Sequence, residues 1–217
     1  MFKPILFGAI AAASFAQPAS AETIYSIYGG WQTSPHSHIS GIHPDTSAAY
    51  DTVFGWEGKS FEMPPYYGAR AEWWNGDWST QIEFTHSKVY AVEADRNAVD
   101  FDKFEFTDGH NIFTVNRVKR WDNALGNRTV YAGAGAGIAL PHVDVLSDLG
   151  EHTYGYQLTG PALKLLAGAR QPIRDNMIAF AEYQFTVSWN EGTLTGGGTF
   201  DTRLITNALN IGIGWEY

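Results

Sequence analysis

The sequence contains no cysteine among its 217 residues. A disulfide-stapled fold is therefore excluded, as are zinc, haem and iron–sulfur centres held by thiolate ligands. Basic residues are scarce as well: 14 lysine and arginine residues stand against 23 acidic ones, which gives a formal net charge of −9. This charge argues against nucleic acid as a partner. No stretch approaches 18 consecutive apolar residues, so a helical membrane protein is also excluded.

The N-terminal segment MFKPILFGAIAAASFAQPASA combines one lysine, an apolar run and the small residues Ala19-Ser20-Ala21. These are the three parts of a secretory signal, so we expect residues 1–21 to be cleaved as a signal peptide. The mature chain, residues 22–217, loses Lys3 and has a formal net charge near −10. Its length fits a single domain.

Alternation is the main feature of what the chain does contain, and the C-terminal segment NALNIGIGWEY shows it most clearly. Every second residue from Leu209 to Tyr217 is large and apolar, whereas the residues between them are small or polar. A chain that ends on an aromatic residue in the apolar phase is typical of the closing strand of an outer-membrane barrel. One face of such a strand meets lipid and the other meets a narrow lumen.

The same period of two recurs along the chain, which is rich in aromatic residues (15%) and has 23 glycines. It predicts strands within 65–74, 78–90, 129–140, 179–190 and 207–217, and approximate strands at 22–32, 108–121 and 156–170. Eight strands form a closed ring that leaves no unpaired edge in hydrocarbon. We therefore predict an all-β fold, an eight-stranded antiparallel transmembrane β-barrel of the outer-membrane type.

The connections of this barrel sort by length if the N-terminus lies on the periplasmic side. Asn75-Gly76-Asp77 predicts a tight hairpin turn. This turn and the segments near 122–128 and 170–177 become periplasmic turns. Four longer extracellular loops are then expected near 33–64, 91–107, 141–155 and 191–203.

Six tryptophans fall near strand ends, as an interfacial aromatic girdle requires: Trp31, Trp73, Trp78, Trp121, Trp189 and Trp215. Five charged residues occupy the inward phase and are expected to form an ion-pair network in a lumen too narrow for a pore: Arg70, Glu72, Glu83, Lys164 and Glu182. All seven histidines fall in the outer half: His36, His38, His43, His86, His110, His142 and His152.

The histidines suggest a metal site at the outer mouth. His142 and Asp144 are two residues apart, so an extended backbone points both side chains to one side. With His36 they make a set of two imidazoles and one carboxylate. Such a set fits non-haem iron or a similar divalent redox metal. The alternative is that these are ordinary polar residues on exposed loops.

Other residues of the outer half could take part in catalysis or binding. The acid–base candidates are Glu57, Glu62, Asp108 and His110. The substrate-binding candidates are Lys59, Tyr66, Lys88, Asn111 and Arg203, whose cations would meet lipid phosphates. Equally, Asp108-Gly109 is explained as a turn, and the two glutamates by pairing with Lys59. The segment GAGAG at 133–137 lacks the G-x-G-x-x-G spacing, and we find no nucleotide, flavin or haem motif.

Four segments carry a resemblance to a known family: WEGKSFEMPPYYGARAEWW, FEFTDGHNIFTVNRVKRW, YAGAGAGIALPHVDV and YQLTGPA. Over nearly the whole mature chain the sequence resembles the rhizobial-type lipid A oxidases of the outer membrane. The resemblance implies a barrel enzyme that uses dioxygen to oxidise the proximal glucosamine of lipid A, within lipopolysaccharide, to 2-aminogluconate with release of hydrogen peroxide. The resemblance does not assign catalytic residues, so the candidates above rest on the spacing of the residues alone. A chain of this kind is also expected to need the barrel assembly machinery for insertion.

Two other functions are compatible with the sequence. One is a non-catalytic structural or adhesive surface barrel, whose loops bind a partner. The other is a lipid A deacylase, which needs a serine and a histidine on one face and a carboxylate to orient the histidine. His38 and Ser40 have that spacing, whereas the adjacent His86 and Ser87 point to opposite faces of a strand.

Overall fold

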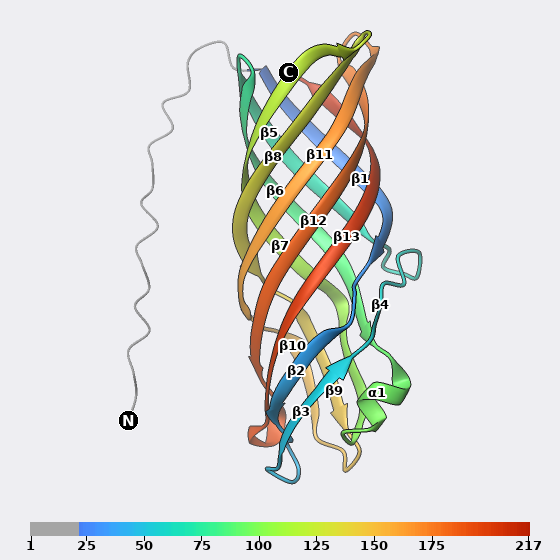
Figure 1. The fold of residues 1–217 in the computed structure, drawn as a ribbon, viewed down its shortest axis with the longest axis vertical. Coiled ribbons are helices and arrows are strands. Elements are labelled where there is room, and N and C mark those ends of the chain that lie inside the picture. Colours follow the sequence, from blue (N-terminus) through green and yellow to red (C-terminus); the bar gives the residue numbers. More distant parts are fainter. Residues whose placement is uncertain (1–21) are drawn as a thin grey trace, which may run out of the picture.

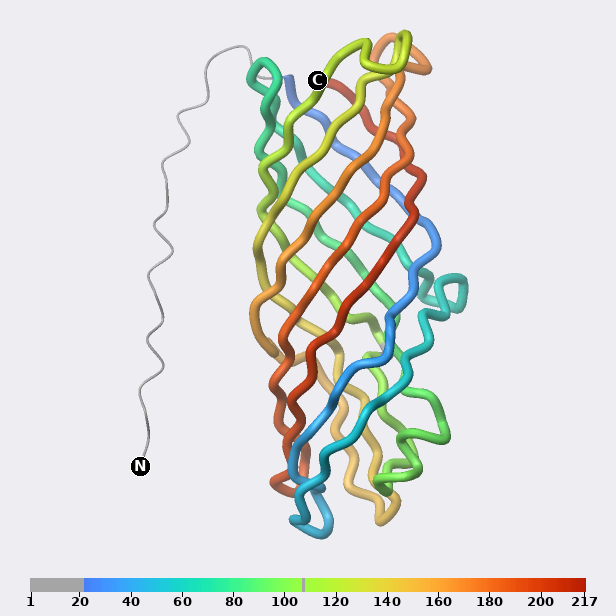
Figure 2. The backbone as a smooth tube through the Cα atoms, in the orientation of Figure 1, coloured from blue at the N-terminus to red at the C-terminus, as the bar shows by residue number. Residues whose placement is uncertain are grey.

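The computed structural model describes residues 22–217, so the expected signal peptide lies outside the described residues. Eight long strands form a closed antiparallel barrel (Figures 1 and 2): β1 (Glu22–Thr33), β5 (Tyr67–Asn75), β6 (Trp78–Ala91), β7 (Phe101–Leu125), β8 (Arg128–Ala139), β11 (Gly160–Arg174), β12 (Met177–Thr193) and β13 (Thr199–Glu216). Each strand pairs with the next in this order, and β13 pairs with β1 to close the ring. The predicted eight-stranded barrel is confirmed.

The two faces of the barrel wall differ as the alternation predicts. On β13, Leu209 and Ile211 are 60% and 72% exposed, whereas Asn210 between them is 3% exposed. The outward positions form a largely apolar belt. We define it as the outward-facing residues, every second one, within the ranges 25–31, 67–73, 78–84, 113–121, 130–138, 163–173, 179–189 and 205–215. Trp31, Trp78, Trp121 and Trp189 stand exposed near its two edges. This belt is the membrane-spanning surface, and the tryptophans form its girdles.

Short turns lie at one end of the barrel, together with Glu22 and the C-terminus. Gly76 and Gly126 sit in two of these turns with φ of 58° and 69°, a conformation that glycine adopts without steric cost. Tyr217 pairs with Thr23 by two backbone hydrogen bonds at the same end. This is the periplasmic end, and the long connections all lie at the opposite, extracellular end (Figure 1).

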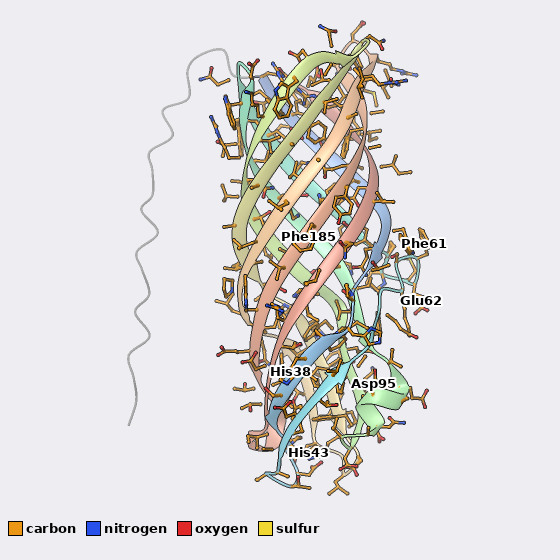
Figure 3. The ribbon with its side chains drawn as sticks, in the orientation of Figure 1. His38, His43, Phe61, Glu62, Asp95 and Phe185 are labelled. Atoms are coloured by element: carbon orange, nitrogen blue, oxygen red, sulfur yellow. The ribbon has the colours of Figure 1, made fainter. Side chains whose placement is uncertain are left out.

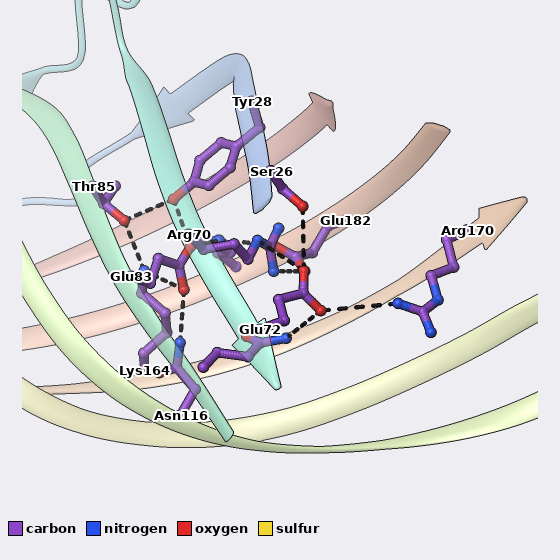
Figure 4. Close-up of polar contacts among 12 residues, drawn as sticks. Ser26, Tyr28, Arg70, Glu72, Glu83, Thr85, Asn116, Lys164, Arg170 and Glu182 are labelled. Carbon is purple, nitrogen blue, oxygen red and sulfur yellow. Dashed lines mark hydrogen bonds and ion pairs between the residues drawn. The ribbon is translucent and has the colours of Figure 1, made fainter. Parts of the chain in front are cut away.

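The lumen is filled by the predicted ion-pair network (Figure 4). The Arg70 guanidinium donates two hydrogen bonds of 2.9 Å to the Glu182 carboxylate, and Lys164 Nζ lies 3.3 Å from Glu83 Oε2. Glu83 also accepts hydrogen bonds from the Tyr28 hydroxyl and from two side-chain amides. Buried charges are tolerated when their remaining hydrogen-bonding capacity is met in this way.

Beyond the belt the wall continues into a second tier, which we call the outer extension. It adds β2 (Ser37–Ile42), β3 (Ala49–Phe54), β4 (Trp56–Glu57), α1 (Glu93–Asn97), β9 (His142–Ser147), β10 (His152–Tyr156) and the 3-10 turn η1 (Thr195–Gly197). β2 pairs with β13, β4 with β6, and β9 with both β7 and β10. Apolar residues that include Phe54, Trp56, Phe104 and Phe200 fill its interior.

The outer extension corrects the predicted boundaries of two loops. The connection between β6 and β7 is residues 92–100 rather than 91–107, and that between β12 and β13 is residues 194–198 rather than 191–203. The strands are longer than predicted because Phe101, Phe104 and Phe200 bury their rings in the extension core. Their backbones are also paired to β9 and β2, an arrangement that local alternation does not reveal.

Residues 58–66, which we call the lateral loop, leave the barrel wall sideways between β4 and β5 (Figure 2). Phe61 and Met63 are 77% and 84% exposed, and Figure 3 shows Phe61 and Glu62 standing off the wall at the outer edge of the barrel. Ser60 fixes the base of the loop, since its hydroxyl accepts a hydrogen bond of 2.9 Å from the Gln32 backbone. The lateral loop therefore presents apolar side chains beside the extracellular edge of the belt.

Candidate functional site

A polar groove of about 460 Å³ lies on the surface of the outer extension, beside β6, β7 and β10. Its charged lining includes Glu57, Lys59, Lys103, Glu105 and His152. Lys103 Nζ donates a hydrogen bond of 2.8 Å to Asp144, which raises the pKa of the ammonium. The groove thus holds fixed charges of both signs outside the barrel wall, where a polar headgroup has access to them.

Lys88 lies between this groove and the belt. The residue is fully buried, and among residues 22–217 its Nζ has no hydrogen-bond partner. Burial lowers the pKa of the ammonium, and the carboxylates of Glu62, Glu105 and Asp108 oppose this effect. Lys88 Nζ lies 5.1 Å from the centroid of the Tyr90 ring, and Tyr90 lines the groove, so this buried cation adds positive charge behind the groove.

Asp108 and His142 face each other next to Lys88. The distance between His142 Nε2 and Asp108 Oδ2 is 3.9 Å, and the Asp108 side chain is 47% exposed. Tyr154 and Tyr156 pack edge-on against the His142 ring, with centroids 4.4 and 4.7 Å away. Since β7 runs from the extension toward the periplasm, Asp108 is closer to the belt than the groove residue Lys103. This pair is therefore the part of the site nearest to the membrane.

Asn111 and Gly109 support the same region from β7. The Asn111 amide oxygen lies 3.0 Å from His86 Nδ1, and because that oxygen only accepts, His86 donates from Nδ1. Gly109 has a φ of 91°, and a Cβ there would lie 2.3 Å from the His86 ring. Asn111 thus orients the His86 imidazole. The Asp108-Gly109 pair forms a local irregularity inside β7 that glycine alone accommodates.

His110 and Tyr66 are directed into the barrel and away from the groove. His110 Nε2 lies 3.1 Å from Asn190 Oδ1 and 3.1 Å from Ser188 Oγ, both on β12. Burial lowers the pKa of His110 to about 4, so the ring is neutral at physiological pH. Tyr66 is 2% exposed and packs against the lumen residue Tyr28. Both residues stabilise the interior and have no access to a lipid outside.

His36 and Arg203 lie in a separate hollow of about 390 Å³, which also contains His38 and Trp189. The structure therefore does not bring His36 to His142 and Asp144. Both Asp144 oxygens are engaged, one by Lys103 at 2.8 Å and the other by His152 at 2.9 Å. Within residues 22–217 the expected triad is not among the groups of three ligand-type side chains whose ligand atoms lie within 4.8 Å of one another.

Several residues in and beside the groove were not named from the sequence as catalytic, substrate-binding or metal-binding candidates. They are Tyr90, Glu105 and His152, which line the groove, and Tyr154 and Tyr156, which pack against His142 beside it. The segment HTYGY, residues 152–156, carries the signal that finds three of them, because His152, Tyr154 and Tyr156 alternate on one face of β10. That face lies beside His142 and Asp144 on the paired strand β9.

Comparison with known proteins supports the fold. No protein-family model matches the chain, and no curated protein matches it. Among solved structures, Neisserial surface protein A shares 13% identity over 91% of this chain and 99% of its own, with a TM-score of 0.50. The outer membrane protein AlkL, determined in lipid bilayers, shares 10% identity over 100% of this chain and 97% of its own, with a TM-score of 0.53.

These similarities and the closed barrel define the class of the protein. The chain is a small integral β-barrel protein of the bacterial outer membrane. Within the described residues no helix combines the length and the apolar character needed to span a bilayer.

Proposed function

We propose that this protein is an outer-membrane enzyme that oxidises lipid A, converting the proximal glucosamine to 2-aminogluconate with dioxygen. The observation that supports it is the position of Lys88, Asp108 and His142 on the outward side of the wall, next to the extracellular edge of the lipid-facing belt. The sugars of lipid A lie at this height, because its acyl chains occupy the hydrocarbon layer beside the belt. A substrate beside the belt thus reaches the Asp108 side chain, which is 47% exposed, without entering the filled lumen, and Lys88 and His142 lie buried next to it.

A second surface feature fits the acyl part of such a substrate. A shallow apolar groove of about 830 Å³ runs along the outer faces of β1, β12 and β13 beneath Phe61 of the lateral loop. Gly29 and Gly30 hollow the wall there, and Trp31, Leu209 and Ile211 line it. Lys59 of the same loop lies over the Tyr90 ring on the other side, at 4.6 Å. The lateral loop therefore has an acyl-sized groove on one flank and the polar groove on the other.

The proposed reaction balances as follows. The C1–H and O1–H bonds of the anomeric carbon break, a C1=O bond forms, and two electrons and two protons pass to dioxygen to give hydrogen peroxide. Water then opens the lactone to the gluconate. Asp108, which faces His142 at 3.9 Å, is placed to accept the O1 proton, and the buried charge of Lys88 favours negative charge in this region. A sugar phosphorylated at C1 lacks that proton and is expected to be refused.

Triplet dioxygen reacts slowly with a closed-shell sugar, so an oxidase without flavin or haem is expected to use a divalent redox metal. The residues named for it do not fit, because His36 lies in a different hollow and both oxygens of Asp144 are already engaged. The proton-transfer steps above involve only the side chains of this chain. Stripping the purified protein with a chelator tests the metal requirement. Full peroxide release from the metal-free enzyme would show that the reaction needs no metal.

Mass spectrometry of lipid A tests the proposal directly. Lipid A is extracted from cells with and without this protein, grown with oxygen. We expect a gain of one oxygen atom, with peroxide released when the purified protein meets the same substrate. Loss of a whole acyl chain would instead identify a deacylase, and unchanged lipid A would contradict both enzymatic functions.

The lateral loop gives a prediction about substrate affinity. Replacing Phe61 and Met63 together by alanine is expected to raise KM for membrane-embedded lipid A by at least about tenfold, with little change in kcat. Burying one such side chain contributes about 1.5–3 kcal/mol, and the loop is remote from the reacting carbon. Steady-state kinetics in vesicles measures both constants.

Leu149→Ala is the matched control, because Leu149 is 72% exposed on the turn between β9 and β10 and touches neither groove. Equal KM values for the double variant and the unmodified protein would show that the lateral loop does not contribute to substrate binding.

A second candidate function is a non-catalytic surface barrel that binds a partner through its outer extension. The observation in its favour is a packed, structured extension with exposed Tyr154, Tyr156 and Leu158, each between 60% and 62% exposed. Unchanged lipid A in cells that express either the native chain or the His142→Ala variant would support it. The deacylase has less support, since the close pair of Ser188 and His110 lies inside the barrel and His110 Nδ1 has no partner among the described residues.

A further inference from the structure

Three side chains with metal-ligand atoms converge at the outer tip of the extension, far from the lipid A site (Figure 3 labels His43 there). His43 and Asp45 belong to the turn between β2 and β3, and Asp148 belongs to the turn between β9 and β10. One ligand atom from each lies within 4.8 Å of the others. The His43 and Asp45 side chains are 5% and 8% exposed, so two of the three are removed from water.

The imidazole of His43 has a defined tautomer. Its Nε2 lies 3.0 Å from the Asp100 carbonyl oxygen, which only accepts hydrogen bonds, so the proton is on Nε2. In the neutral ring Nδ1 then carries a lone pair. Nδ1 lies 4.0 Å from Asp45 Oδ2, and neither buried atom has a hydrogen-bond partner within residues 22–217.

Two buried acceptors that face each other without a donor are unfavourable, since each has lost its water. A cation between them removes that cost. We propose that His43 Nδ1, Asp45 and Asp148 bind one divalent metal ion of the zinc class. An imidazole with two carboxylates matches the nitrogen and oxygen ligands of zinc, and a water molecule completes four-coordination.

The separations agree with this assignment. Zinc bonds of about 2.0–2.2 Å place neighbouring ligand atoms roughly 3–3.5 Å apart. His43 Nδ1 and Asp45 Oδ2, at 4.0 Å, therefore need to close by less than about 1 Å. Asp148 is exposed at the end of a turn, so its carboxylate has room to complete the site.

Asp100 acts as the supporting residue. Its carbonyl accepts a hydrogen bond from His43 Nε2 and another, of 3.1 Å, from the Asp148 backbone N–H. A metal-binding imidazole is commonly oriented through its second nitrogen in this manner. The ion thus joins two turns and the start of β7 into one unit, and its role is to rigidify the tip rather than to reach lipid A.

Calorimetric titration tests the site on the mature chain folded in detergent micelles. The protein is stripped with EDTA, freed of chelator and titrated with zinc chloride. We expect one zinc ion per chain and a higher unfolding temperature with zinc. Asp45→Asn and Asp148→Asn are each expected to weaken zinc binding by at least about tenfold. Asp148 is exposed, so its variant keeps the fold, which circular dichroism confirms.

His38→Gln is the control, because His38 pairs with Asp51 at 2.5 Å on the exposed face of the same hairpin. Zinc affinity is expected to be unchanged in this variant. Three outcomes overturn the proposal: no saturable zinc binding, equal affinity in the Asp148→Asn variant, or tighter binding of calcium than of zinc. None of them bears on lipid A oxidation, so the two proposals fail independently.

Discussion

Replacing Arg70 by methionine is expected to lower the free energy of unfolding of the barrel by about 3–5 kcal/mol. Arg70 and Glu182 side chains are 1% and 0% exposed, and two hydrogen bonds of 2.9 Å join them. Methionine fills much of the same volume but leaves the Glu182 carboxylate as a buried charge without its counter-ion. Removal of one partner therefore costs far more than the pair contributes.

A double-mutant cycle separates these two effects. Arg70→Met with Glu182→Leu is expected to recover most of the loss, because neither charge then remains buried. Equilibrium unfolding in urea from detergent or lipid vesicles measures each step. Arg120→Met is the control: Arg120 pairs with Glu22 at the partly exposed periplasmic rim, and we expect a cost of about 1 kcal/mol or less. A double variant as unstable as Arg70→Met would contradict the argument from an uncompensated charge.

Asp108→Asn is expected to lower kcat for lipid A oxidation by about 100-fold, because the amide cannot accept the O1 proton. His142→Gln is expected to have a smaller effect of the same kind, since His142 orients Asp108 rather than reacting itself. KM is expected to change little in both variants, because the grooves and the lateral loop are intact. Initial rates of peroxide release, with lipid A mass as the second readout, measure the effect.

His36→Gln distinguishes the observed grouping from the triad expected from the sequence. If His36 acted with His142 and Asp144, its loss would abolish activity as completely as the loss of His142. Since His36 lies in a separate hollow, we expect full activity to be retained. His38→Gln serves as the matched control for an exposed imidazole on the same hairpin. Full activity in Asp108→Asn would show that the proton acceptor lies elsewhere.

The barrel was predictable because its signal is local. A strand alternates its side chains with a period of two, so the pattern at Leu209 to Tyr217 fixes which residues face lipid, whatever the rest of the chain does. The same argument placed Arg70, Glu83 and Lys164 in the lumen, where they meet partners from other strands. It also placed His142 and Asp144 on one face of β9.

The residues that face those two side chains were beyond local inference. His36 was assigned to them because both lie in outer loops, but β2 pairs with β13 while β9 pairs with β7. The sideways path of the lateral loop likewise depends on Gln32 and Ser60, which a sequence pattern does not connect.

The features of the barrel wall follow from the sequence alone. They are the number of strands, the residues that face lipid or lumen, and the end of the barrel at which the histidines lie. Which loop residues meet depends on the folded arrangement, which brings Asp108 to His142 and Asp148 to His43. The physical reason is the range of the interactions. Alternation is imposed within each strand by backbone geometry, whereas contacts between loops depend on long-range pairing and on burial of the aromatic core of the outer extension.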